Sequence, residues 1–247
     1  MAGFVLLNCR LFTGGADLTG QSNKIELSCE LEEKPTTNYA SEGWKEVIGS
    51  LFATKISGAG QWQAGDPGQV DDATWAELTG RTRHPWTVCP ESADVGELAY
   101  FTDVLRGSYK LGEGVGEVAP WESSGSGSAP LLRGTAAHPP GTPRTATGTG
   151  TGLNLGALAE GQRMFAALHV LSIAGTDTPT ITARVESDAD NTWATPTTRA
   201  TFAAATVRGG QFIASTAGPV TDTWWRIAWT ITGTAPSFLF AAALGIA

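Results

Sequence analysis

A twelve-residue segment near the N-terminus, residues 22–33 with the sequence SNKIELSCELEE, alternates between apolar and polar residues. Its apolar positions are Ile25, Leu27, Cys29 and Leu31. The positions between and beside them are Lys24, Glu26, Ser28, Glu30 and Glu32. A period of two predicts a β-strand with one apolar face and one acidic face. We interpret the acidic face as the lining of a channel through which a polyanion passes.

The net charge of −8 is confined to the first part of the chain. Residues 1–134 contain 10 Lys and Arg against 18 Asp and Glu, whereas residues 135–247 contain six of each kind. This asymmetry predicts two regions with different surroundings. A negative field repels nucleic acid at a distance, which argues against tight DNA binding through a basic patch.

Length and composition suit a globular protein. A chain of 247 residues that is 41% hydrophobic suits one large β domain or two smaller ones. No apolar run approaches the roughly 20 residues that a membrane span needs. The first seven residues, MAGFVLL, lack the basic segment of a signal peptide, so we expect synthesis in a cytoplasm. Three cysteines without a CxxC spacing argue against a disulfide framework or a zinc site.

The first region, residues 1–134, is expected to be a β domain with one short helix. A turn-rich loop follows the acidic strand, and LFATKISG then alternates as a strand. The segment DDATWAELTG predicts the helix, with Asp71 or Asp72 as its cap and Gly80 at its end. Further strands are expected at residues 83–89, 98–110 and 115–121.

Residues 135–152 are rich in Gly, Thr and Pro and predict a connector, which SSGSGSAP at residues 123–130 introduces. The alternating Thr-Gly run at its end is alternatively a weak first strand of the second region. Residues 153–247 predict an antiparallel sandwich of short strands. These strands are expected at residues 163–173, 180–187, 198–207, 211–215, 223–232 and 237–247. Trp225 and Trp229 share an apolar face with Ile227 and are expected in the core.

No combination of residues points to catalysis. The sequence lacks GxSxG, HExxH, a Walker A loop and paired CxxC motifs. His169 lies in an apolar strand and is interpreted as a hydrogen-bonded structural residue. Asp188 and Asp190 resemble half of a calcium loop but lack its glutamate, so a surface turn is expected. We therefore predict no catalytic residues, no metal, no cofactor and no enzymatic activity.

The chain resembles the tail tube proteins of bacteriophages with long, non-contractile tails. The resemblance covers most of the chain and rests on its overall pattern. It is carried by residues 17–39 (DLTGQSNKIELSCELEEKPTTNY), 41–66, 116–127, 164–172, 183–191, 196–202 and 221–233 (TDTWWRIAWTITG). It implies a mainly β protein: a tail-tube-type β-sandwich or barrel subunit with one short helix, followed by a C-terminal antiparallel β-sandwich on the outside of the tube.

The resemblance also implies hexameric rings that stack into a tube for DNA ejection, located in the virion tail and assembled in the host cytoplasm. The expected partners are further copies of the chain, tape-measure and other tail proteins, and double-stranded DNA that passes without specific binding; no membrane is expected. The implied lumen residues are Glu26, Glu30 and Glu32. The implied inter-subunit loop comprises Glu33, Lys34, Pro35, Thr36, Thr37, Asn38, Tyr39, Ala40, Ser41, Glu42 and Gly43. Trp44 and Trp62 are expected in the core or between rings.

Two other classes of protein compete with this interpretation. A tail fibre, baseplate or capsid-decoration protein with a carbohydrate-binding sandwich would present Trp193 and Trp224 as exposed platforms. A secreted hydrolase or lectin-like fragment is disfavoured because the sequence shows neither a signal peptide nor a catalytic constellation.

Overall fold

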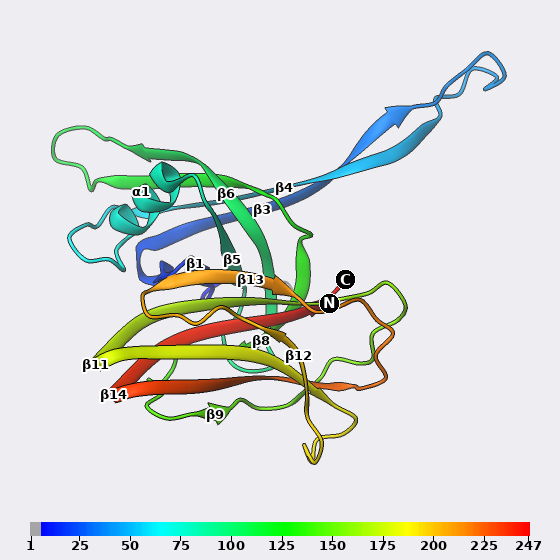
Figure 1. The fold of residues 1–247 in the computed structure, drawn as a ribbon. Helices are drawn as coiled ribbons and strands as arrows, with labels where there is room; N and C mark the ends of the chain where they lie inside the picture. The colour runs from blue at the N-terminus through cyan, green and yellow to red at the C-terminus, as the bar shows by residue number, and fades with distance from the viewer. Residues whose placement is uncertain (1–5) are drawn as a thin grey trace.

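The computed structural model describes residues 6–247, and Figure 1 shows a body of two β-rich layers from which one long hairpin projects. It confirms the mainly β class with one short helix. Residues 1–5, most of the segment on which the signal-peptide prediction rests, lie outside the described residues. The elements are β1 Arg10–Thr13, β2 Ala16–Asp17, the 3-10 helix Thr19–Gln21, β3 Ser22–Pro35, β4 Val47–Gln61, α1 Val70–Gly80, β5 Arg83–Cys89, β6 Leu98–Leu111, β7 Pro120–Gly127, β8 Leu132–His138, β9 Gly148–Thr149, β10 Leu153–Asn154, β11 Met164–Asp188, β12 Thr197–Thr201, β13 Gly209–Ala214 and β14 Trp224–Ile246.

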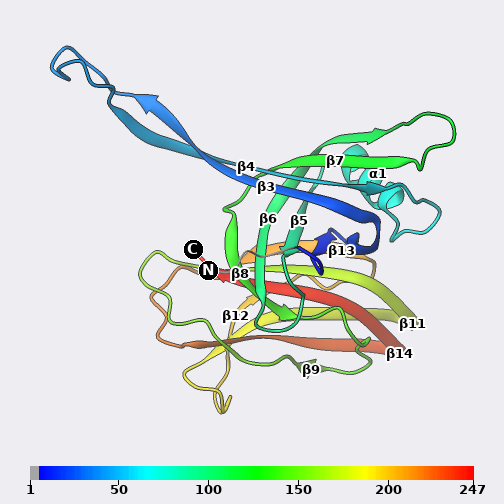
Figure 2. The same cartoon turned by 180° about the vertical axis from the view of Figure 1, so that it is seen from behind.

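The N-terminal region is a curled antiparallel sheet. Its strands follow the order β3–β4–β7–β6–β5–β1–β2. Side chains on the inner face of this sheet pack together with helix α1 and form one apolar core, which includes Leu11, Ile56, Val70, Trp86 and Trp121. The outer face of strands β3, β4, β7 and β6 has no layer over it (Figures 1 and 2).

Strand β7 differs from the sequence-based prediction. The prediction placed a strand at residues 115–121 and read SSGSGSAP as the start of a connector, whereas most of that segment is β7. The strand alternates small buried residues, such as Ser123 and Gly125, with outward serines. A Cβ atom at Gly125 would collide with the side chain of Val104 and the carbonyl oxygen of Leu105. Close packing against β6 therefore selects small residues here, and their low hydropathy conceals the strand.

Helix α1 is confirmed where the sequence predicts it, but its ends differ in detail. Gln69 occupies the N-cap position, and Asp71 and Asp72 lie in the first turn, where a negative charge interacts favourably with the helix dipole. Asp72 accepts a hydrogen bond from the backbone N–H of Gly65 at 2.8 Å. The helix ends at Gly80, and the next residue, Arg81, is its C-cap in a left-handed conformation with φ of 52°.

The C-terminal region is confirmed as an antiparallel sandwich, but two long strands build it instead of four short ones. β11 and β14 pair from Met164–Ile246 to Asp188–Trp224. The pairing is irregular between Thr176 and Thr180, where the ribbon folds over. Gly175 and Gly233 adopt φ values of 124° and 113° at this corner, which other residues rarely adopt.

Folding the ribbon brings the inner faces of its two halves together. One apolar cluster contains Leu168, Val185, Trp225, Trp229 and Phe240 from both halves. Trp225 and Trp229 are thereby confirmed as core residues. Strand β13 extends the upper half of the ribbon, and β12, β10 and the two-residue β9 extend the lower half (Figure 1).

The two regions share structure across their predicted boundary. β8 contains residues 134 and 135 and pairs with both β6 and β14. A second apolar cluster joins Phe12 and Phe101 of the first region to Ala167 and Ala243 of the second. The regions are consequently packed together as one body, and much of the predicted connector is irregular chain that runs along the sandwich, where β9 pairs with β14.

A buried ion pair holds α1 against the N-terminal sheet. Arg106 of β6 is only 4% exposed, and its Nε donates to Glu77 Oε2 of α1 at 2.9 Å. Thr13 of β1 lies 3.0 Å from Glu77 and 3.1 Å from Arg106. Arg106 also donates to Ser123 of β7 and lies 4.7 Å from the centre of the Trp86 ring. Burial lowers the pKa of Arg106, and the Glu77 carboxylate opposes that shift.

Removing one partner of this pair leaves the other charge buried without compensation. We expect Arg106→Met to reduce the free energy of unfolding by about 3–5 kcal/mol. The double variant Arg106→Met with Glu77→Leu should recover a large part of that loss, because neither charge then remains. Urea denaturation of the two variants measures both effects; equal stability of the single variant and the original chain would contradict this account.

Two buried histidines are held in the neutral form. His169 lies 2.8 Å from the Thr87 hydroxyl and 2.8 Å from the carbonyl oxygen of Gly14. A carbonyl only accepts, so Nδ1 donates to Gly14 and Nε2 accepts from Thr87. This confirms His169 as a hydrogen-bonded structural residue. His138 likewise donates to the Phe240 carbonyl at 3.0 Å and accepts from Arg144 at 3.1 Å. Burial lowers the pKa of each histidine to about 4.

These shifts predict a loss of stability in mild acid. Between about pH 6.5 and pH 4 the unfolded chain binds a proton at each histidine that the folded chain does not. Stability should therefore fall as the pH falls through this window, by up to on the order of 3 kcal/mol for each histidine, and be fully present above it. Urea midpoints between pH 7 and pH 5 measure the slope. His169→Gln, which retains a donor and an acceptor, should flatten it.

Candidate assembly surface

The projecting hairpin is formed by the outer halves of β3 and β4. β4 pairs with β7 only as far out as Lys55, which lies opposite Ser126. Beyond that pair, residues 30–53 form a two-stranded ribbon with no strand beside it; this segment is called the arm (Figures 1 and 2). An isolated two-stranded hairpin is at best marginally stable in water. The arm is therefore suited to a protein surface outside this chain.

The arm carries an unusual concentration of exposed apolar side chains. Trp44 is 80% exposed, Phe52 75% and Leu51 72%. Further exposed apolar residues of the arm are Leu31, Tyr39, Val47 and Ile48. Large contiguous apolar surfaces of this kind mark sites of association. The exposure also shows that Trp44 is not a core residue of the subunit, so that alternative of the sequence analysis is wrong, whereas its role between subunits stays a prediction.

The tip of the arm is ordered by its own hydrogen bonds. The strand ladder continues past Pro35 through a bond of 2.9 Å from the Thr36 N–H to the Glu46 carbonyl oxygen. Asn38 Oδ1 accepts from the Ala40 N–H at 2.8 Å, which closes a tight turn. Glu33, Lys34 and Pro35, which the sequence assigned to the loop, belong to strand β3 instead. The remaining loop residues lie at the tip.

The outer face of β3, β4, β7 and β6 is polar and of low relief. Strand register places Glu26, Ser57, Ser124 and Ser108 in one row across the four strands. The hydroxyls of Ser108 and Ser124 are 2.8 Å apart. This surface, here called the outer face, contains the predicted lumen residues Glu26, Glu30 and Glu32, all of which are exposed.

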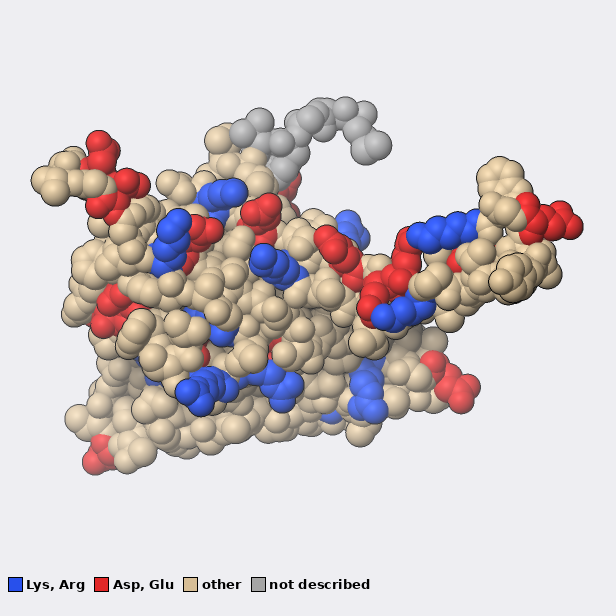
Figure 3. Space-filling model, turned by 90° about the horizontal axis from the view of Figure 1, so that it is seen from above, with Lys and Arg blue, Asp and Glu red and all other residues tan. Residues whose placement is uncertain are grey.

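The outer face is balanced in charge, unlike strand β3 taken alone. Its four exposed acidic residues are Glu26, Glu30, Glu32 and Glu122, and its four exposed basic residues are Lys24, Lys34, Lys55 and Lys110. Three ion pairs join the two sets: Lys24–Glu26, Lys34–Glu32 and Lys110–Glu122. Figure 3 shows the two signs interspersed over this side of the molecule. Lys55, Lys110 and Glu122 were missed by sequence reasoning because strand pairing alone brings them beside β3.

Two strand edges of this sheet have no strand partner among residues 6–247. β3 pairs only with β4, which leaves its other edge free from Ser22 to Pro35. β6 pairs with β5 only as far as Leu105, so its last residues have a strand on one side alone. Free edges of this length offer unpaired backbone groups to another chain.

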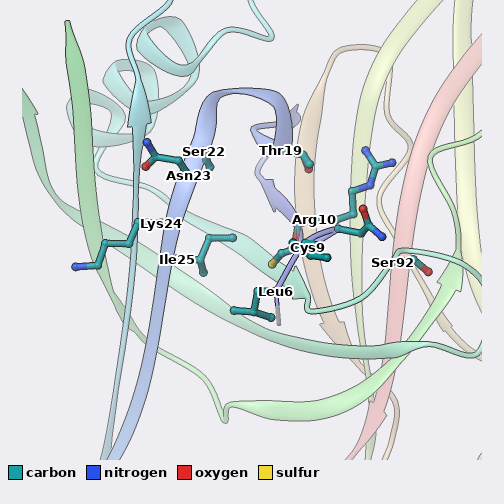
Figure 4. A pocket seen from close by; sticks show the side chains of 11 residues that line it. Leu6, Cys9, Arg10, Thr19, Ser22, Asn23, Lys24, Ile25 and Ser92 are labelled. Carbon is teal, nitrogen blue, oxygen red and sulfur yellow. The ribbon is translucent and has the colours of Figure 1, made fainter. Parts of the chain in front are cut away.

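A trough runs along the inner side of β3. Its first part is a cavity of about 650 Å³ between the start of β3 and residues 6–10, with Arg10 and Ser22 on its rim (Figure 4). Leu6, Cys9 and Ile25 also line a second, more apolar cavity of about 410 Å³. That cavity is further lined by Leu27, Cys29, Val88, Pro90, Tyr100 and Leu131. Cys29 and Leu131 then border a third cavity of about 570 Å³, which Phe52 lines at the base of the arm. We call these three adjoining cavities the trough.

The other aromatic residues singled out from the sequence lie apart from the arm. Trp62 is half-buried against the N-terminal core, and its indole N–H lies 3.1 Å from Asp71 Oδ1 and 3.0 Å from the Tyr109 hydroxyl. Trp193 is half-buried, and the Arg226 guanidinium lies 4.0 Å from the centre of its ring. Trp224 is also half-buried at the start of β14.

Asp188 and Asp190, which resemble half of a calcium loop in the sequence, lie in a surface turn. Asp190 accepts from the Thr192 N–H at 2.8 Å, and Asp188 from the Ala189 N–H at 2.7 Å, as in a surface turn. Over residues 6–247 no group of three or more His, Cys, Asp and Glu side chains is placed to hold a metal ion. In the same range no helix has both the length and the apolar character to cross a membrane.

No known protein-family profile matches the chain, and no curated protein matches it. Among solved structures, the chain is similar to a protein in the tail of an empty gene transfer agent particle refined with C6 symmetry, at 18% identity over 50% of this chain and 94% of the other, with a TM-score of 0.40. It is similar to a protein of the anti-feeding prophage baseplate at 9% identity, over 54% and 98% of the two chains, with a TM-score of 0.41. It is similar to the SPP1 Dit protein, of the hub adsorption apparatus of phages that infect Gram-positive hosts, at 11% identity over 97% and 99%, with a TM-score of 0.34. At TM-scores below 0.5, none of these similarities by itself establishes a shared fold or function.

From the balanced charge of the outer face we predict how a charge-reversed variant binds DNA. Replacing Glu26, Glu30 and Glu32 together by Lys removes the balance without touching the core, because all three side chains are exposed. We expect the variant to fold normally and to bind duplex DNA at least about tenfold more tightly than the original chain at low salt, with an affinity that falls steeply as salt rises. Fluorescence anisotropy with labelled DNA measures this, with the three Gln replacements as the matched control. Unchanged affinity in a folded Lys variant would contradict it.

Proposed function

We propose that this chain is a structural subunit of a bacteriophage tail tube, a virion protein that assembles with itself into stacked rings and acts without catalysis. The observation that carries the proposal is the sheet β3–β4–β7–β6, which has one open face, two free edges and an apolar arm at one end. In a monomer the free edges and the apolar arm are an aggregation hazard. In stacked rings of copies the edges pair with each other, the arm contacts a further copy, and the polar open face is left to line a channel.

Ring closure follows from strand direction. The sheet contains four strands that alternate in direction, so β3 and β6 run opposite to each other. A neighbouring copy related by rotation about an axis along the strands therefore brings its β3 beside β6 as an antiparallel pair. Repetition of this contact closes a β-barrel and removes both edges. The resemblance to tail tube proteins suggests six copies in each ring.

The outer face then lines the lumen. Its serines and alanines are small, and three of its four lysines form an ion pair with a glutamate on the same face. Binding of a protein to DNA derives most of its non-specific affinity from Lys and Arg that neutralise phosphates. A lumen in which most lysines are already paired with a glutamate gives passing double-stranded DNA few such sites. We propose that this balance, together with the acidic charge of β3, lets DNA slide through to the host without specific binding.

Assembly of the purified chain tests this function. We expect rings or hollow tubes in negative-stain electron microscopy over a concentration series. Trp44→Ser, at the tip of the arm, should raise the concentration needed for stacking at least about tenfold, because burial of a large aromatic side chain is lost. Val207→Ser removes an equally exposed apolar residue outside the arm and should leave assembly unchanged. Both variants should keep the original thermal midpoint. A chain that stays monomeric throughout would contradict the proposal.

A further inference from the structure

The arm and the trough are two unsatisfied apolar surfaces of one chain. The arm presents Tyr39 and Trp44 at its tip with nothing over them. The trough offers an apolar section of about 410 Å³ that is open to solvent, with Leu6, Ile25, Leu27 and Leu131 in its wall. Within one copy the arm projects away from the body, so its tip lies outside its own trough (Figure 1).

We propose that the arm of a second copy docks in this trough, with Trp44 in the apolar section and Glu46 beside Arg10 at the rim. This inference rests on the proposed function and specifies the contact between successive rings. The arm leaves the body at the end of β3, and the rim of the trough lies at the start of β3, by Ser22 and Thr19. Copies stacked along the strand direction therefore bring the arm of one copy to the mouth of the next.

The charges of the trough rim and of the arm also favour a second copy as the occupant of the trough. Arg10 lies on the rim of the first cavity, and no acidic residue of the described part of the chain lines that cavity. Lys24 also borders it, but its side chain points to the outer face, where it pairs with Glu26 (Figure 4). Arg10 is exposed and makes no ion pair with any described residue. The outer part of the arm carries Glu33, Glu42 and Glu46, all exposed. Insertion by the tip places Trp44 deeper than Glu46 by two residues, or about 7 Å, so the aromatic ring reaches apolar surface while the carboxylate stays at the basic rim.

Surface continuity also favours a second copy. The apolar wall of the trough passes through Cys29 and Leu131 to Phe52, at the base of the resident arm. An incoming arm in the trough thus lies close to the base of the resident arm, and the two cover each other's apolar residues. Repetition of the contact from copy to copy is heterologous and open, as a growing tube requires.

Cross-linking tests the contact directly. Trp44 is replaced by the photo-reactive residue p-benzoylphenylalanine, and assemblies made from mixed isotope-labelled and unlabelled copies are irradiated and mapped by mass spectrometry. We expect cross-links between different copies, from position 44 to residues 6–10, 25–29 or 131. Cross-links that map instead to α1 or to residues 112–119 in tubes of normal appearance would overturn the docking site and leave the proposed function standing. A chain that never assembles would overturn both.

Charge reversal gives an independent readout. Arg10→Glu and Glu46→Arg should each raise the concentration needed for stacking about fivefold, in line with a partly exposed ion pair. The chain that carries both changes should return close to the original value, because the pair is restored between copies. Leu6→Asp should weaken stacking, whereas Val118→Asp, at another exposed apolar site in the loop between β6 and β7, should not. Failure of the double variant to recover, with single variants impaired, would contradict the assigned pair.

Discussion

The buried ion pair between Arg106 and Glu77 fixes the sheet on which the proposed ring depends. Arg106 lies at a register shift in β6, where one extra residue separates it from Ser108. Arg106 points inward to the helix, as Val104 does two residues earlier, and the bulge that follows returns Ser108 to the outer face beside Leu105. One interaction thus anchors α1, β1, β6 and β7 behind the sheet.

Residue periodicity and capping residues predicted the strands and the helix whose structure depends mainly on their own sequence. The strand at residues 22–33 was predicted from its alternation, and the helix from a capping Asp71 or Asp72 and a terminal Gly80. Strand β7 was missed because its inward positions must be small, which removes the apolar signal. β11 and β14 were divided at their corner because Gly175 and Gly233 resemble chain breaks, whereas they let one ribbon fold over.

The outer face and the trough were only partly predictable from the sequence, because strand pairing brings most of their residues together. The exposure of Glu26, Glu30 and Glu32 follows from alternation along one strand. The balancing lysines and the serine row follow from pairing between strands that are far apart in sequence, such as β3 with β4 and β4 with β7. The trough depends on residues 6–10, β3, β5 and residue 131 coming together. No period within a single segment encodes such a surface.

In the proposed tube, the free edges and the arm would serve separable contacts. The edges of β3 and β6 lie side by side only when a neighbour is rotated about the strand direction, which closes a ring of limited size. The arm projects along the strand direction, so its contact is made by translation and has no natural end. A weak arm contact beside a strong edge contact yields rings before tubes, and the reverse order yields open chains. The arm is a bare two-stranded ribbon whose contact with a partner must offset the cost of ordering it, which places it on the weaker side. Rings should therefore form first, and stacking should set the length of the polymer.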